Sequence, residues 1–266
     1  MASPIISIDT QHNDMIHDSQ FDYYARKLAT CSSDRSIKIF EVAGEICQPS
    51  ATIVEHEGPV WQVAWGHPKF GVILASCSYD ASVIIHRESP QGTWKKIHTH
   101  KFHESSVNSI SWAPHDYGLA LACASSDGKV SILELEKEDK WIVNHFQNDT
   151  LGTNAVSWAP YSSVGSFTED GRSVRRLVTG SCDNTVRIWR SVDGGWSEEG
   201  KISVSSPHSD WVRDVSWAPN TGMPYNIIAS GSEDRTVYIW RQSDAEKTWT
   251  PTLMNQFDAP VWRVSW

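Results

Sequence analysis

The chain of 266 residues repeats one arrangement of polar and apolar residues about every fifty positions. One recurring segment alternates polar with apolar residues and ends in an aromatic residue, at Phe21, Trp65, Trp112, Trp158, Trp217 and Trp266. A second recurring segment is a β-branched run interrupted by an aspartate, at Asp34, Asp80, Asp127, Asp183 and Asp234. Because the two segments alternate along the whole chain, the chain is built from one repeated supersecondary unit.

Each repeat is predicted to form four short antiparallel strands. Both segments alternate with a period of two, and the second is broken at a turn of the Ser/Asp/Gly type, which predicts three strands. A tryptophan downstream of the aspartate marks a fourth strand in four repeats, at Trp94, Trp141, Trp196 and Trp249. Repeats of this length with four strands are typical of β-propeller blades.

The sequence therefore predicts an all-β fold, with a single propeller domain over residues 1–266. We expect five complete blades and the first strand of a sixth. The predicted repeats span about 11–50, 55–97, 102–144, 148–203 and 207–251, and an incomplete one spans 256–266.

The 14 tryptophans fall into four registers of the repeat. Most of them end the first strand, end the third strand or mark the fourth strand. Three others lie early in the first strand, at Trp61, Trp211 and Trp262. Because these registers recur so regularly, we expect the rings to fill the wedges between neighbouring blades rather than to form a sugar-binding platform.

A set of polar residues also recurs with the repeat. A histidine precedes the first-strand aromatic residue by nine positions in four repeats, a hydroxyl usually precedes the aspartate by four, and a tryptophan follows it by six in two repeats. The members are His12, Thr30, Asp34, His56, Ser76, Asp80, His103, Asp127, Thr179, Asp183, Trp189, His208, Ser230, Asp234 and Trp240. In the fourth repeat the count of nine gives Asp149 in place of a histidine.

Histidine, a hydroxyl and aspartate are also the components of a nucleophilic triad. An enzyme needs one such triad, whereas a buried hydrogen-bond chain that locks a turn to a strand is useful in every blade. We therefore interpret the set as structural. No catalytic, cofactor-binding or metal-binding residue is predicted.

The sequence contains three further features that bear on possible binding sites and loops. His98, His100 and His103 have a spacing that suggests zinc, but we expect the first two to be solvated on a connection between strands. Four of the five cysteines lie in apolar runs and no C-x-x-C pair occurs, which predicts buried thiols. An insert over residues 161–176, rich in Ser and Gly, is expected to form an exposed loop between a first and a second strand.

The net charge of −9 and the absence of any Lys/Arg cluster longer than Arg175–Arg176 argue against direct binding of nucleic acid. No apolar stretch is long enough to span a bilayer, and the N-terminal residues lack the pattern of a secretory signal. We therefore expect a cytoplasmic or nuclear protein.

The repeats resemble WD-repeat propellers and, more narrowly, the Sec-thirteen family. The resemblance is carried by long segments, among them HEGPVWQVAWGHPKFGVILASCSYDASVIIHRE (56–88), CDNTVRIWR (182–190) and HSDWVRDVSWAP (208–219). Residues 14–42 and 105–132 resemble the family equally closely. Runs of this length are far more specific than an isolated Trp-Asp dipeptide.

The resemblance implies a propeller that stays open and acts as a non-enzymatic scaffold without cofactors. It implies a place in the COPII vesicle coat at the endoplasmic reticulum membrane, for transport to the Golgi, and in the outer ring of the nuclear pore complex. The implied partners are the larger COPII outer-coat subunit, a nucleoporin of the Y-shaped complex and an amino-acid-sensing complex at the lysosome or vacuole. Membrane association is implied only through the coat.

Family members insert a partner's β-blade between their first and last blades. The run Ile5, Ile6, Ser7 and Ile8 occupies the position of a fourth strand before the first blade, so we expect it at the open seam beside that inserted blade. Family members also continue with three strands beyond the last motif, which suggests that this chain is a truncated or alternatively spliced form. An alternative function is a generic WD-repeat adaptor that binds a peptide at the propeller's central opening.

Overall fold

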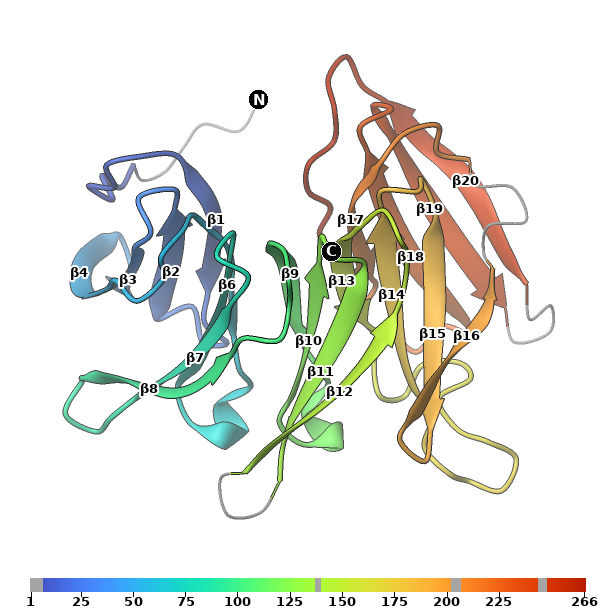
Figure 1. Ribbon diagram of the computed structural model, residues 1–266, viewed down its shortest axis with the longest axis horizontal. Coiled ribbons are helices and arrows are strands. Elements are labelled where there is room, and N and C mark those ends of the chain that lie inside the picture. The colour runs from blue at the N-terminus through green and yellow to red at the C-terminus, as the bar shows by residue number, and fades with distance from the viewer. Residues whose placement is uncertain (1–6, 137–139, 202–206, 244–247) are drawn as a thin grey trace. The chain divides into compact units, whose positions relative to one another are not determined.

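The computed structural model describes residues 7–136, 140–201, 207–243 and 248–266 (Figure 1). The chain forms two compact units, residues 1–108 and residues 109–266. Outside the strands, the described residues contain two short 3-10 helices, η1 (Pro68–Phe70) and η2 (His115–Tyr117). Neither of these helices has the length and apolar character needed to cross a bilayer.

The strands form five antiparallel sheets, each made of four strands in chain order. The first two sheets contain β1 (Ile16–Phe21), β2 (Lys27–Ser32), β3 (Ile37–Ala43) and β4 (Ile46–Ile53), then β5 (Val60–Trp65), β6 (Ile73–Ser78), β7 (Val83–Glu88) and β8 (Trp94–His100). The third contains β9 (Val107–Trp112), β10 (Ala120–Ser125), β11 (Lys129–Leu135) and β12 (Trp141–Gln147). The last two contain β13 (Thr153–Trp158), β14 (Arg175–Ser181), β15 (Val186–Val192) and β16 (Gly195–Lys201), then β17 (Val212–Trp217), β18 (Tyr225–Ser232), β19 (Thr236–Ser243) and β20 (Trp249–Gln256). These five meanders confirm the prediction of an all-β fold with five complete blades.

The turn between the second and third strand of each sheet requires a left-handed backbone residue. Arg35, Ala81, Asn184 and Arg235 adopt positive φ at this position, and Gly128 does so in the third sheet with φ 79°. At Gly128 a Cβ atom would lie 1.8 Å from the Asp149 carbonyl oxygen. Only glycine therefore fits the tight approach of this turn to the chain that follows β12.

The core lies between neighbouring sheets of each unit, because the period-two alternation gives every strand one apolar face. In the first unit, residues of the first and second sheets pack together, including Ile39 and Val60. In the second unit, Ile188 of β15 packs in one cluster with Trp217 of β17 and Trp240 of β19. The buried tryptophans of the first-strand and third-strand registers thus fill spaces between sheets, as predicted.

Two of the three tryptophans placed early in the first strand do not follow that expectation. Trp211 and Trp262 are 45% and 60% exposed. The first strands carry a bulge near their start, for example between Val212 and Asp214 in β17. Arg213 is the residue at this bulge, and its guanidinium lies 5.0 Å from the centre of the Trp211 ring and 4.5 Å from that of the Trp262 ring.

The segment 261–266 lies where the first strand of a sixth sheet is expected, but among the described residues it is not paired into a sheet. Trp266 donates its Nε1–H to the Ser216 carbonyl at 3.0 Å, as Trp158 does to the Ser111 carbonyl at 2.9 Å. Within the described residues no second strand pairs with this segment, and a strand is defined by such a ladder. The expected sixth first strand is therefore docked against β17 without being part of a sheet.

Candidate functional site

The fifth sheet joins its four predicted polar residues into one hydrogen-bonded chain. Nε1 of Trp240 donates to Oγ of Ser230 at 2.8 Å, and Nε2 of His208 lies 2.7 Å from the same oxygen. The other ring nitrogen of His208, Nδ1, lies 3.1 Å from Oδ2 of Asp234. Ser230 and Trp240 are fully buried and His208 is 4% exposed. This hydrogen-bonded chain therefore links Ser230 of β18 and Trp240 of β19 to His208, which lies before β17, and to Asp234, in the turn that follows β18.

One protonation state satisfies every member of this chain. A carboxylate only accepts, so Nδ1 of His208 donates to Asp234, and Nε2 then accepts from the Ser230 hydroxyl. Burial lowers the pKa of His208, although Asp234 opposes that shift. Burial also works against ionisation of Asp234, but hydrogen bonds, first that of Thr236, outweigh it and hold its pKa below the usual range. The histidine is therefore neutral and the aspartate charged at neutral pH.

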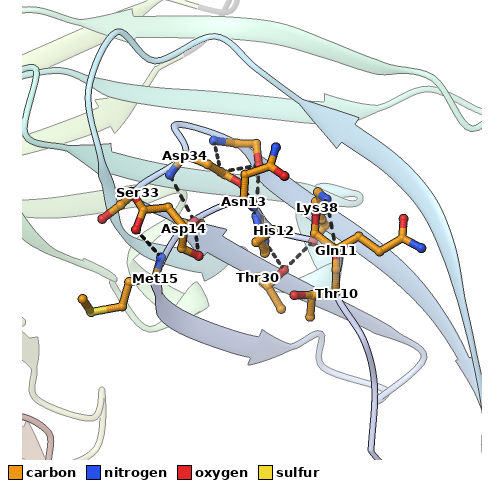
Figure 2. Close-up of polar contacts among 12 residues, drawn as sticks. Thr10, Gln11, His12, Asn13, Asp14, Met15, Thr30, Ser33, Asp34 and Lys38 are labelled. Atoms are coloured by element: carbon orange, nitrogen blue, oxygen red, sulfur yellow. Dashed lines mark hydrogen bonds and ion pairs between the residues drawn. The ribbon is translucent and has the colours of Figure 1, made fainter.

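The first sheet repeats this geometry, with threonine as the hydroxyl (Figure 2). Nδ1 of His12 lies 2.9 Å from Oδ2 of Asp34, and Nε2 lies 2.9 Å from Oγ1 of Thr30. The backbone N–H of Asn13 donates to the same carboxylate oxygen at 2.9 Å. Burial works against ionisation of Asp34, but hydrogen bonds from Ser36, Asn13 and His12 outweigh it and hold its pKa well below the usual range.

The second sheet has the same three hydrogen-bonded residues, but its fourth residue makes no hydrogen bond. Nδ1 of His56 lies 3.1 Å from Oδ2 of Asp80, and Nε2 lies 2.8 Å from Oγ of Ser76. The residue that corresponds to Trp240 is His86, which is 1% exposed. Neither of its ring nitrogens has a hydrogen-bond partner, because imidazole is shorter than indole. Burial lowers the pKa of His86 to about 4.

The third sheet keeps the histidine and the aspartate but not the hydroxyl. His103 is 7% exposed, and Asp127 accepts a hydrogen bond from the Lys129 backbone at 2.9 Å. Cys123 occupies the hydroxyl position and is fully buried, and burial raises the pKa of its thiol. Cys31 and Cys77 are buried as well, as predicted, whereas Cys182, the fourth cysteine in an apolar run, is only half-buried.

In the fourth sheet the central residue is Asn148. Its Oδ1 accepts from Oγ1 of Thr179 at 2.7 Å and from Nε1 of Trp189 at 2.9 Å. Its Nδ2 donates to Oγ1 of Thr153 at 2.9 Å and to Oγ of Ser181 at 2.7 Å. The amide therefore contacts the hydroxyl, as His208 does in the fifth sheet, and also accepts directly from the indole, which in the fifth sheet donates to Ser230 instead.

Two residues of the fourth sheet lie apart from this network. Oδ2 of Asp183 pairs with the guanidinium of Arg187. Asp149, which the count of nine residues selected, has a buried Oδ2 without a hydrogen-bond partner. Four residues lie between Asn148 and the start of β13, against three between His208 and the start of β17, and Gly152 with φ 129° lies in the longer connection. This extra residue shifted the count by one.

These arrangements can hold strands together but cannot present a nucleophile. The hydroxyls of Ser76, Thr179 and Ser230 are fully buried, whereas a nucleophile must reach its substrate. Among the described residues no group of three or more His, Cys, Asp or Glu side chains is placed to bind a metal ion.

The two histidines expected on a solvated connection lie in β8 instead. His100 is the last residue of β8 and is 5% exposed, stacked on Phe102 and edge-on to His103. His98 is half-buried. The expectation was wrong because the fourth strand continues six residues beyond its marker, Trp94.

The predicted seam segment is described only in part. Ile5 and Ile6 lie outside the described residues. Ser7 is exposed and Ile8 is half-buried, and neither belongs to a strand. The placement of this segment at a seam therefore stays a prediction.

One recurring residue is not among those predicted from the sequence, namely the hydroxyl two positions after the aspartate. Ser36, Ser82 and Thr236 each donate a side-chain hydrogen bond to that aspartate, at 2.6, 2.5 and 2.6 Å. The signal is present as D-R-S, D-A-S and D-R-T in the sequence. This hydroxyl fixes the second carboxylate oxygen, since Nδ1 of the histidine contacts the first.

The repeated units of this chain also match family models of known proteins. Residues 3–41, 47–87, 143–190 and 200–241 match the WD domain, G-beta repeat family. Residues 71–160 match the WD40 domain of anaphase-promoting complex subunit 4. A chain in a crystal structure of the mitotic checkpoint complex superposes with a TM-score of 0.72, covering 96% of this chain and 69% of that one. Its sequence identity is 19%, so this likeness concerns the fold alone.

Relatives of known name match nearly the whole chain. The SEC13 homolog of Dictyostelium discoideum is 49% identical, covering 98% of this chain and 87% of the relative. That of Drosophila melanogaster is 46% identical, covering 100% and 76%. The protein transport protein SEC13 of Mycosarcoma maydis is 41% identical, covering 98% and 85%. The chain therefore belongs to the SEC13 family of WD40-repeat β-propeller proteins.

Proposed function

We propose that this chain is a non-enzymatic scaffold subunit of the COPII vesicle coat and of the outer ring of the nuclear pore. Its partners are the larger outer-coat subunit and a nucleoporin of the Y-shaped complex, each of which adds a β-blade to the open propeller. An amino-acid-sensing complex at the lysosome or vacuole is a further partner of the same kind. The support at family level is the group of relatives described as protein transport proteins.

The observation that carries the proposal is an apolar position of the fifth sheet that is less buried than the same position in the other four sheets. At one position of the third strand, Ile39, Ile85, Ile132 and Ile188 are all 0% exposed. Ile239, at the same position of β19, is only half-buried. An apolar sheet face of this kind is a docking surface when it is not covered by a neighbour.

A second feature of the same region fits addition of strands. The segment 261–266 lies against the fifth sheet, and among the described residues no strand pairs with its other edge. Val261 and Val264 contact Gly231 as Val212 and Val215 contact Gly180 one sheet earlier. A partner that contributes strands here would satisfy backbone groups and bury the apolar face together.

A scaffold role without catalysis agrees with the polar network. Its hydroxyls are buried and its members recur from sheet to sheet, so they stabilise the fold rather than activate a substrate. Association with the endoplasmic reticulum membrane then takes place through the coat, and nucleic acid is not a direct ligand.

The experiment is a binding titration of the whole chain with the larger outer-coat subunit. We expect a one-to-one complex that Ile239→Asp weakens at least about tenfold, because a charge on a buried apolar contact is costly. The matched variant Ile46→Asp changes a 60% exposed residue of the first sheet and is expected to bind normally. Deletion of residues 1–10 is expected to weaken the complex if the N-terminal run lies at the seam. Equal affinity of Ile239→Asp and Ile46→Asp would refute docking on this face.

The alternative, a peptide-binding adaptor, is favoured by one observation. The Arg213 guanidinium lies 5.0 Å from the centre of the Trp211 ring and 4.5 Å from that of Trp262, and both indoles are exposed. Exposed tryptophan and arginine are common in recognition sites. If Trp262→Ala abolishes capture of a partner that Ile239→Asp leaves intact, the adaptor function is the better one.

A further inference from the structure

The insert over residues 161–176 is anchored by a buried arginine at its end. Arg176 is 1% exposed, and its Nη1 donates to the Val164 carbonyl at 2.6 Å. Its Nε donates to Oε2 of Glu199 at 2.5 Å. The guanidinium lies 5.1 Å from the centre of the Trp217 ring. The insert is therefore an exposed loop over much of its length, as predicted, but it is held against the fifth sheet at Val164.

Two asparagines of the fifth sheet hold the other side of the insert. Nδ2 of Asn226 donates to the Val164 carbonyl at 2.9 Å. Nδ2 of Asn220, in the connection between β17 and β18, donates to the Ser162 carbonyl at 2.7 Å. The insert and this connection are thus fixed relative to each other by hydrogen bonds from both sides.

A cavity of about 150 Å³ lies between these two segments. Its walls are mainly apolar and include Val164, Trp217, Met223 and Ile227, with the hydroxyl-bearing residues Ser163, Thr221 and Tyr225 among them, and no charged side chain lines it. Its two asparagines already donate to the insert, as described above. The cavity thus offers apolar contact and few unsatisfied donors.

We propose that this cavity receives one uncharged apolar side chain, of leucine, methionine or phenylalanine, from a peptide segment of a partner protein. A cavity of ~150 Å³ lined by apolar groups takes a benzene-sized group, which is too small for a nucleotide or a drug-sized ligand. A charged side chain would lose its hydration there without a counter-charge. The hydrogen bonds that fix the walls reduce the cost of ordering them on binding.

This inference goes beyond the scaffold function, because it needs neither a solenoid partner nor an added blade. A single apolar anchor in a rigid pocket is how many peptide interfaces gain most of their affinity. The insert then has a role of its own, since it supplies one wall of the pocket.

The test is selection of binding peptides from a displayed library of random heptapeptides, with the whole chain as bait. We expect the enriched peptides to share one leucine, methionine or phenylalanine. Its replacement by alanine is expected to weaken binding about tenfold or more. Val164→Asp is expected to abolish binding, and the matched variant Val54→Asp, at a 66% exposed residue outside the cavity, to leave it unchanged.

Met223→Asp gives the same readout if Val164→Asp proves unstable, because Met223 is 49% exposed and tolerates a polar group. The proposal is overturned if no peptide is enriched, if the enriched peptides need a charged residue, or if both cavity variants bind them normally. Since the bait is the chain alone, these outcomes are independent of whether it binds a coat subunit.

Discussion

The indole of Trp240 donates to Ser230 at 2.8 Å, and this contact begins a chain of donors that ends at a carboxylate. The Ser230 hydroxyl in turn donates to Nε2 of His208, and Nδ1 of His208 donates to Asp234. Because every donor points the same way, each bond polarises the next. This chain is also buried, so each bond that is lost leaves a partner without water to replace it.

Trp240→Phe is expected to destabilise the protein by about 1 to 2 kcal/mol, through the lost hydrogen bond and the smaller ring. The matched variant Trp249→Phe changes a half-buried indole in β20 that makes ring contacts and no hydrogen bond to the described residues. It is expected to cost less. Urea unfolding followed by circular dichroism measures both, and equal losses would show that the bond to Ser230 contributes little.

The second sheet provides a prediction about acid. His86 is buried without a partner, and its pKa is lowered from 6.5 to about 4. The unfolded chain therefore binds this proton first as the pH falls below 6.5, and the free energy of unfolding decreases until the pH reaches the folded pKa. The loss from this one group is at most about 3 kcal/mol.

His86→Phe is expected to remove that part of the pH dependence, so its melting temperature should fall less than that of the parent between pH 6.5 and pH 4. The matched variant His145→Phe replaces an exposed histidine of β12 and is expected to keep the parent's slope. Melting curves across this range decide the matter. Identical slopes for the parent and His86→Phe would contradict the prediction.

The repeat made the fold predictable, because strand patterns that recur in one order leave few alternatives. The polar residues of the first, second and fifth sheets were also predictable, since constant spacing placed His12, His56 and His208 correctly. The fourth sheet was not, because one extra residue near Gly152 moved the count from Asn148 to Asp149. Counting a fixed number of residues back from the aromatic residue gives the wrong position when an extra residue lies within the counted stretch.

Other differences arose where the outcome depends on contacts between distant segments. The composition of residues 161–176 predicts a loop, but whether a loop is free depends on groups such as Asn226 that lie far away in sequence. The exposure of Trp211 and Trp262 was hidden for a similar reason. Trp211 lies just before β17 and Trp262 lies in a segment outside the described sheets, so the alternating pattern of a strand does not determine their burial.

The fourth sheet allows a direct test of which residue carries the network. Asn148→Ala removes four hydrogen bonds of a buried amide and is expected to cost about 3 kcal/mol or more. Asp149→Ala removes a carboxylate whose buried Oδ2 has no partner, so it is expected to be nearly neutral. Denaturant unfolding of both variants checks the order. A larger loss for Asp149→Ala would restore the assignment made by counting.

Arg176 provides a prediction about the insert. Replacing it with methionine keeps much of the apolar stem but removes the bonds to Val164 and Gln242 and leaves Glu199 without its cation. Because the Glu199 side chain is 25% exposed and stays accessible to water, the loss comes mainly from the hydrogen bonds and is expected to be about 1 to 3 kcal/mol. We expect Arg176→Met to lower the melting temperature and to speed proteolytic cleavage within residues 161–175.

The matched variant is Arg172→Met, because Arg172 pairs with Asp170 and Asp193 at the surface and is 54% exposed. Surface pairs of this kind contribute about 1 kcal/mol or less, so this variant is expected to be cleaved at the parent's rate. Limited proteolysis followed by mass spectrometry locates the cuts. If both variants are cleaved alike, the insert is not held by Arg176, and the cavity it borders would lose one of its fixed walls.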